Sequence, residues 1–133
     1  MKTKGFTLVE LLVVIAILAI LATVSVVGYT SYIATTEETA AKSDAASIAD
    51  AIDVALVMNK KVYIEVEDGK YILIERTEDG VEYTTGTATT GYTKIAEIPD
   101  ALAGGLSVDS DDNLIYESAK DVKVNVDTNE VVD

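Results

Sequence analysis

One charged side chain, Glu10, stands at the start of a long apolar run. From Leu11 to Gly28 no residue is charged, and a helix of that length covers about 27 Å, close to the apolar thickness of a bilayer. An ionised carboxylate near that core costs about 2.5–3.5 kcal/mol on insertion scales, so such groups are usually paired or functional. The chemistry expected of Glu10 is pairing with a cation. The nearest plausible cation is an amine created by cutting the chain between Gly5 and Phe6.

The segment around this carboxylate carries a specific signal, Lys2-Thr3-Lys4-Gly5-Phe6-Thr7-Leu8-Val9-Glu10-Leu11-Leu12. With the apolar run behind it, the segment closely resembles the class III signal peptide of type IV pilins and of the related pseudopilins. The resemblance implies that a prepilin peptidase cuts after Gly5 and methylates the new N-terminus at Phe6. It also implies that Glu10 meets the N-terminus of a neighbouring subunit when a filament assembles on an inner-membrane platform.

Two other interpretations of the N-terminal segment stay open. An ordinary secretory signal also has a basic start, an apolar stretch and small residues such as Ala22. Such a signal would have an uncharged apolar region, and cleavage near Ala22 would not explain why the run continues to Gly28. A single-pass anchor that carries an adhesive domain needs only the apolar length, and it leaves Glu10 unexplained. In each case Lys2 and Lys4 favour a cytoplasmic N-terminus by the positive-inside bias.

Catalytic groups are scarce in this chain of 133 residues. It contains no histidine and no cysteine, which removes the commonest general base and the thiol nucleophile. The remaining carboxylates, hydroxyls and lysines show no catalytic spacing. We therefore predict that the protein is not an enzyme and uses no cofactor.

One acidic stretch could bind a cation, because Asp109, Asp111 and Asn113 alternate as oxygen ligands do in a calcium loop. An EF-hand loop would need glycine in place of Leu114 and glutamate in place of Lys120, so the match is partial. The three residues are weak calcium candidates. We predict that they form an acidic turn and hold no metal.

The elements that position these residues are predicted from periodicity. A single long helix is expected to end near Asn59, with a membrane-spanning half over residues 6–28 and an amphipathic half over residues 29–59. In the second half an apolar stripe recurs every three or four residues, at Ala41, Ala45, Ile48, Ile52, Ala55 and Leu56. Gly28, a poor helix former, and Thr35 with Glu38, a capping-box pattern, mark two places where the helix could bend or melt.

From Lys61 the period changes to two, and Asp68-Gly69 between alternating runs indicates a hairpin. Later turn signals predict an antiparallel sheet of about four to six strands over residues 60–133. Residues 84–91, rich in threonine and glycine, are predicted to be an exposed loop, and Pro99 is predicted to open a short helical turn. The fold class is α+β, with a long N-terminal helix packed on a small antiparallel sheet as in pilins, behind a leader of residues 1–5.

Charge and composition limit the partners. The formal net charge of −13 disfavours direct nucleic-acid binding, and the absence of cysteine excludes disulfides. We interpret the chain as the structural subunit of a type IV pilus, a homo-oligomer in its filament. Its precursor would be a single-pass protein of the cytoplasmic membrane, and the assembled form would lie at the cell surface. A pseudopilin of a type II secretion system and a membrane-anchored adhesive protein are the alternatives.

Overall fold

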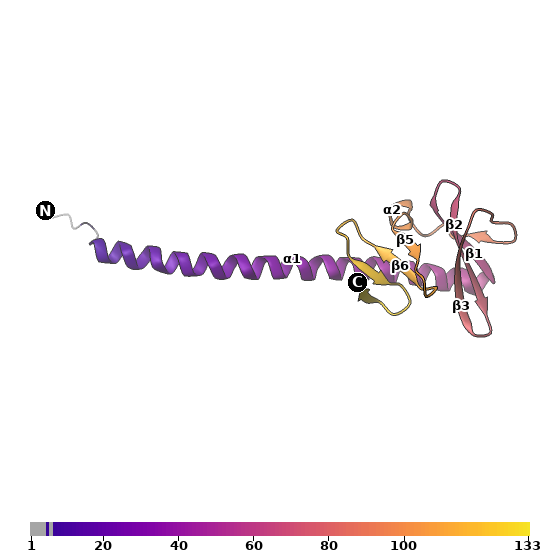
Figure 1. Ribbon diagram of the computed structural model, residues 1–133, viewed down its shortest axis with the longest axis horizontal. Coiled ribbons are helices and arrows are strands. Elements are labelled where there is room, and N and C mark those ends of the chain that lie inside the picture. The colour runs from indigo at the N-terminus through magenta and orange to yellow at the C-terminus, as the bar shows by residue number, and fades with distance from the viewer. Residues whose placement is uncertain (1–4, 6) are drawn as a thin grey trace. The chain divides into compact units, whose positions relative to one another are not determined.

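The computed structural model describes Gly5 and residues 7–133, so Lys2, Lys4 and Phe6 lie outside the described residues. A helix of 51 residues, α1 (Leu8–Met58), is followed by eight strands and one short helix (Figure 1). The chain forms two compact units, Met1–Thr36 and Glu37–Asp133. The predicted fold class is confirmed: a long N-terminal helix and small, largely antiparallel sheets make an α+β protein.

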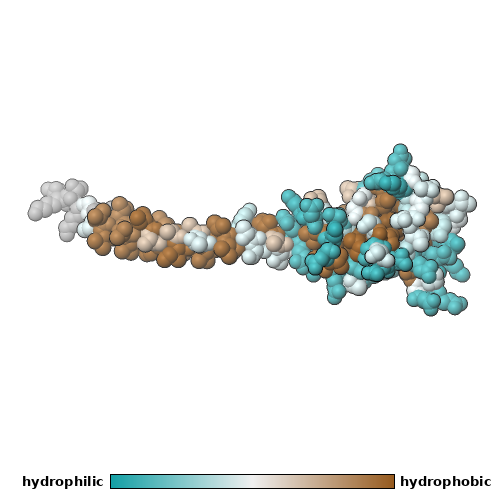
Figure 2. All heavy atoms as spheres, in the orientation of Figure 1, coloured by the Kyte–Doolittle hydropathy of each residue, from teal (hydrophilic) through white to brown (hydrophobic). Residues whose placement is uncertain are grey.

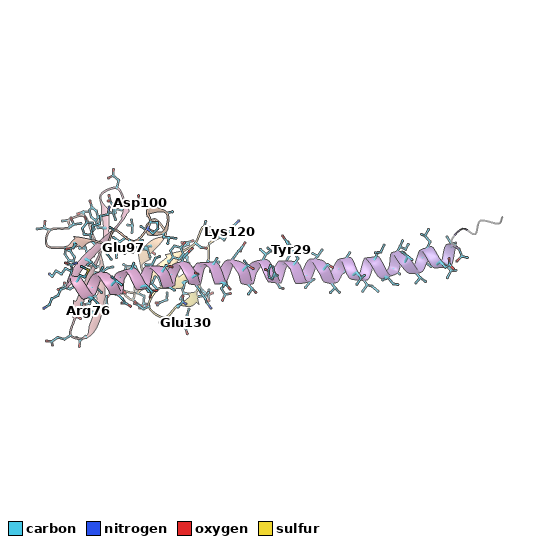
Figure 3. All side chains as sticks on the ribbon, turned by 180° about the vertical axis from the view of Figure 1, so that it is seen from behind. Tyr29, Arg76, Glu97, Asp100, Lys120 and Glu130 are labelled. Carbon is cyan, nitrogen blue, oxygen red and sulfur yellow. The ribbon has the colours of Figure 1, made fainter. Side chains whose placement is uncertain are left out.

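In the first unit, the apolar residues of α1 are exposed on every side. All residues from Leu8 to Tyr32 are exposed, and this part of the helix is largely brown, with paler patches, on its visible face in Figure 2. Tyr29, labelled in Figure 3, is 67% exposed. Among the described helices, α1 is long and apolar enough to cross a membrane, and none of its most apolar window is buried.

The few hydroxyl groups in this apolar part bond to the helix itself. Thr23 Oγ1 donates to the carbonyl of Ala19 at 2.9 Å, and Ser25 Oγ donates to the carbonyl of Leu21 at 2.7 Å. Buried polar groups in an apolar solvent are costly unless they are hydrogen-bonded. These bonds therefore let the segment enter an apolar environment with its hydroxyls satisfied.

The helix is continuous through both places where an interruption was considered. Gly28 is helical, and so are Thr35 and Glu38. Thr35 Oγ1 donates to the carbonyl of Ser31 at 3.0 Å, and Glu38 pairs with Lys42 at 3.3 Å between Oε1 and Nζ. The capping-box interpretation of Thr35 and Glu38 is wrong, because their backbone groups are already inside a helix.

In the second unit, α1 packs one stripe against both sheets. Five residues of the predicted stripe are fully buried, and Ala55 lies half-buried at its margin; the buried ones are Ala41, Ala45, Ile48, Ile52 and Leu56. They share one core with inward-facing strand residues such as Val62, Ile74, Leu114 and Val124.

The first sheet contains β1 (Lys61–Glu67), β2 (Lys70–Thr77), β3 (Gly80–Gly86) and β4 (Thr93–Lys94), in the order β3-β2-β1-β4. The Asp68-Gly69 hairpin is confirmed, with Gly69 at φ 77° and Val62 opposite Ile74. Two expectations are corrected. β4 pairs with β1 in parallel, and β3 extends through Gly86, so Thr84–Gly86 belong to a strand and not to the predicted loop.

The second sheet is antiparallel throughout, with β5 (Leu106–Val108), β6 (Leu114–Glu117), β7 (Lys123–Asn125) and β8 (Glu130–Val132) in sequential order. The prediction of one sheet with four to six strands is therefore wrong in number, because eight strands form two four-stranded sheets. Pro99 does precede a helical turn, α2 (Asp100–Ala103).

Two tyrosine hydroxyls tie the parts of this unit together. Tyr83 on β3 donates to Asp127 Oδ1 at 2.6 Å and so joins the first sheet to the loop between β7 and β8. Tyr116 on β6 donates to Asp44 Oδ2 of α1 at 3.1 Å. Burial, reinforced by the neighbouring carboxylate, raises the pKa of Tyr83 and of Tyr116 above the ordinary tyrosine value. Both hydroxyls therefore remain protonated donors at neutral pH.

Candidate functional site

The start of α1 is closed by a reciprocal pair of hydrogen bonds between Thr7 and Glu10. The Thr7 backbone N–H donates to Glu10 Oε2 at 3.2 Å, and the Glu10 backbone N–H donates to Thr7 Oγ1 at 3.2 Å. Leu11 N–H donates to the Thr7 carbonyl at 3.1 Å, which begins the helical ladder. This arrangement is a capping box, in which two of the N–H groups left free at a helix start are satisfied by each other's side chains.

The partner of the Glu10 carboxylate is thus the backbone N–H of Thr7. Sequence reasoning expected a cation, whereas the structure places a neutral N–H donor beside the carboxylate. The position also suits a negative charge, because the N-terminus of a helix carries a partial positive charge. The cap uses Oε2, and no described residue donates a hydrogen bond to Oε1.

Of the predicted processing and assembly residues, the structure describes two. Gly5 lies before the helix without regular structure, and Glu10 lies in its first turn. Phe6 is outside the described residues. Thr7 is the capping residue that sequence reasoning missed. The signal was present, since Thr7-Leu8-Val9-Glu10 has the capping-box spacing directly before an apolar run.

The calcium candidates lie in the turn between β5 and β6. Asp109 Oδ1 accepts hydrogen bonds from the backbone N–H groups of Asp111 and Asn113, each at 2.9 Å, and Oδ2 accepts one from Asn113 Nδ2 at 3.2 Å. These bonds lower the pKa of Asp109, and the bond from the Asn113 backbone has the largest effect. The Asp109 oxygens therefore stabilise the turn. Within this turn, Asp112 has φ 62°.

The side chains of these candidates do not converge as ligands. Asp111 and Asn113 line a hollow of about 480 Å³ that also exposes Glu82 and Asp127. Within the part of the chain that the structure describes, no three acidic or other metal-binding side chains are grouped to hold an ion. The geometry supports the prediction of an acidic turn, which a calcium titration would test.

Comparison with known proteins identifies the N-terminal segment. Residues 1–26 match the family described as the prokaryotic N-terminal methylation motif, and this range contains Gly5, Phe6, Thr7 and Glu10. No curated protein and no solved structure matches the chain. This motif marks pilin-type structural proteins, and here it is followed by the long apolar helix α1. The match supports a class III signal peptide of the kind found in type IV pilins and pseudopilins.

Proposed function

We propose that the chain is the structural subunit of a type IV pilus. A prepilin peptidase cuts after Gly5 and methylates Phe6, and the first half of α1 then carries the subunit into a helical filament. In this proposal residues 1–5 are the leader, 6–28 the membrane and assembly half of the helix, 29–59 its amphipathic half and 60–133 the head. The observation that carries the proposal is the capped, fully exposed apolar start of α1.

This half of α1 needs a cover that its own chain does not provide. Large apolar side chains such as Leu12, Ile15 and Leu18 are each more than half exposed. Contiguous apolar surface of this extent is unstable in water and marks a membrane or protein contact. A bilayer covers it before assembly, and copies of the same helix cover it afterwards. Such a change of cover is what a filament subunit stored in a membrane requires.

Glu10 supplies the register in this assembly. In a bundle of apolar helices an unpaired carboxylate is costly, and the amine of Phe6 from a neighbouring subunit offsets that cost. Breaking such a buried pair typically costs about 3–5 kcal/mol, so misregistered helices are strongly disfavoured.

The proposed maturation and assembly steps determine which partners the chain should have. The precursor is a single-pass protein of the cytoplasmic membrane with its leader inside, and the assembled subunit lies at the cell surface. The peptidase, the inner-membrane assembly platform and other copies of the chain are the expected partners. The net charge of −13 argues against direct contact with nucleic acid.

The test is the chemical identity of the N-terminus in assembled material. Fibres sheared from cells should contain this chain starting at N-methylated Phe6, as measured by mass spectrometry. Gly5→Leu should block cleavage and leave the precursor in the membrane. An intact Met1 on protein recovered from fibres would contradict the proposal. Cleaved, methylated protein that never appears in long surface fibres would favour the role of a pseudopilin in type II secretion instead.

A further inference from the structure

We propose that the open edge of β3 binds an extended, positively charged segment of another protein, which adds a strand to the first sheet. The inference does not rest on the proposed function, because it concerns only the compact unit Glu37–Asp133. It assigns a ligand class to the hollow beside Tyr83, namely a peptide that carries lysine or arginine.

The first observation is that β3 has one paired edge and one open edge. β3 is an end strand of its sheet, and all seven of its residues lie opposite residues of β2. It contacts β5 of the second sheet, but these two strands do not pair. The other end strands, β4, β5 and β8, have only two or three residues each. Short end strands, lysine and proline are common protections against unwanted pairing, and β3 has none of them.

The second observation is the direction of the backbone groups of β3. A two-residue turn joins Thr77 to Gly80, which lie opposite each other. The pair next to such a turn exchanges hydrogen bonds, and every second pair along an antiparallel ladder does the same. The backbone N–H and C=O groups of Val81, Tyr83 and Thr85 therefore point away from β2. No strand among the described residues pairs with them on that side.

A hydrogen bond on the far side of β2 agrees with this alternation. Arg76 N–H donates to the Lys60 carbonyl at 3.1 Å, so it points away from β3. Arg76 lies opposite Val81, and this pair is therefore one of those without mutual hydrogen bonds. The outward direction of the Val81 backbone groups thus follows from the contacts of both neighbouring strands.

The third observation is the hollow that follows this edge. Val81, Glu82, Tyr83 and Thr84 all line it, and the side chains of consecutive strand residues point to opposite faces of a sheet. Because all four residues line the hollow, it lies along the edge of β3 and not on one face. Its volume of about 480 Å³ falls within the range of about 300–1,000 Å³ that is typical of ligand pockets. A short extended segment can therefore reach the strand.

The charge of the hollow selects the kind of segment. Glu82 lines it from β3, and Asp111, Asp112 and Asp127 line it from two turns of the second sheet. Asp127 accepts a hydrogen bond from Tyr83, and the ion pairs of the described residues include none of these four carboxylates. Lysine or arginine side chains on the incoming segment would complement this charge, whereas an acidic segment would be repelled. The backbone edge gives the pairing, and the carboxylates select the side chains.

The test uses a short labelled synthetic peptide with blocked ends, in which lysine and valine alternate. Its dissociation constant for the full chain in an uncharged detergent is measured by fluorescence anisotropy. One control peptide has glutamate in place of lysine, and a second has the lysine sequence with its backbone nitrogens methylated. We expect the unmodified lysine peptide alone to bind, and its affinity should fall as added salt screens the charges.

Two sets of variants separate the backbone edge from the charge, with thermal unfolding used to check that each is folded. Val81→Pro removes one outward N–H and should weaken binding about two- to ten-fold, because proline is tolerated on an end strand and one hydrogen bond is lost. Val81→Ala keeps the N–H and should bind as wild type does. Asp111→Asn with Asp112→Asn should weaken binding at least about two-fold. Glu97→Gln with Glu130→Gln removes two charges outside the hollow and should have a smaller effect.

Hydrogen exchange gives a signature that charge alone cannot produce. When the peptide binds the wild-type chain, the amides of Val81 and Tyr83 should exchange more slowly. The amides of Glu82 and Thr84, already bonded to β2, should change little. Absence of binding, binding without this alternation, or equal binding of either control peptide would overturn the inference. The same alternation produced by raising the concentration of the chain alone would assign the edge to a second copy, and would overturn it too.

Discussion

The two halves of α1 differ in what covers their apolar side chains. From Leu8 to Tyr32 every residue is exposed, whereas from Ala41 to Leu56 a regular stripe is buried by the two sheets of the same chain. Both halves are rich in aliphatic residues, but only the second half also carries charged residues such as Lys42, Asp50 and Asp53. The difference lies in the pattern: an all-round apolar helix needs an external cover, and a one-sided apolar helix is covered by its own fold.

The same contrast holds for two short segments with the same spacing, one in each half. Thr7 and Glu10 cap the helix because α1 begins at Leu8. Thr35 and Glu38 have the same spacing in the middle of the helix. There the Thr35 hydroxyl donates to the Ser31 carbonyl, and Glu38 forms an ion pair with Lys42. The spacing of threonine and glutamate therefore gives a capping box at the start of α1 and not in its interior.

The largest effect is expected in the first half, from Glu10→Ala. Loss of the carboxylate leaves the amine of a neighbouring Phe6 without its partner, at a cost of about 3–5 kcal/mol in an apolar bundle. Membrane insertion and leader cleavage should be unchanged, and sheared fibres should be nearly absent. Glu10→Asp should be intermediate, since its carboxylate is one methylene shorter. Normal fibre yield from cleaved Glu10→Ala would show that the first half does not depend on this charge.

The second half should respond in folding and not in processing. Ile48→Ala removes a side chain that is 1% exposed and should lower the free energy of unfolding by about 2–5 kcal/mol. Val54→Ala on the same half of the helix is the matched control, because Val54 is 59% exposed and should change stability by about 0.5 kcal/mol or less. Urea unfolding of the full chain in detergent, followed by tyrosine circular dichroism, measures both. Equal losses would contradict the one-sided burial.

A smaller effect is expected where the head is held together by the Tyr83 hydroxyl. Tyr83→Phe leaves Asp127 without its donor and should lower stability by about 1 kcal/mol. Because the pKa of Tyr83 is raised on folding, the folded state keeps this proton more tightly than the unfolded state. Stability should be unaffected below about pH 10 and fall as the pH rises above it. Tyr83→Phe should show a shallower fall, measured by thermal unfolding at a series of pH values.

The smallest effect is expected from calcium. The oxygens of Asp109 already accept hydrogen bonds within their turn, so thermal unfolding should hardly differ between calcium and chelator. A calcium-dependent rise of many degrees would mean that the turn rearranges into a site. Asp111→Asn should then abolish that rise.

Long patterns could be predicted from the sequence, and short ones could not. The stripe through Ile48 and the hairpin at Asp68-Gly69 were predicted because each repeats its period over several residues. The second sheet was not recognised as separate because β5, β7 and β8 have three residues each, too few to establish an alternation. The parallel strand β4 has two residues and gives no local signal.

At the N-terminal segment, too, the extended motif could be predicted from the sequence and the local hydrogen-bonding pattern could not. Gly5, Phe6 and Glu10 were predicted from a resemblance that spans the N-terminal segment, and their roles in cleavage and assembly remain predictions. Thr7 was overlooked because the capping-box rule was applied in the middle of the helix at Thr35, where a bend or local melting was considered. The structure favours Thr7 because only there does the helix begin.

The unbroken course of α1 through Gly28 has a consequence for a filament under tension. Glycine costs about 1 kcal/mol relative to alanine in a helix, and its neighbours Val26 and Val27 favour extended backbone. A pulled subunit should therefore unwind first around Gly28. Each unwound residue lengthens from about 1.5 Å to about 3.3 Å along the axis, so a few residues per subunit would let the fibre stretch before any head lost its fold.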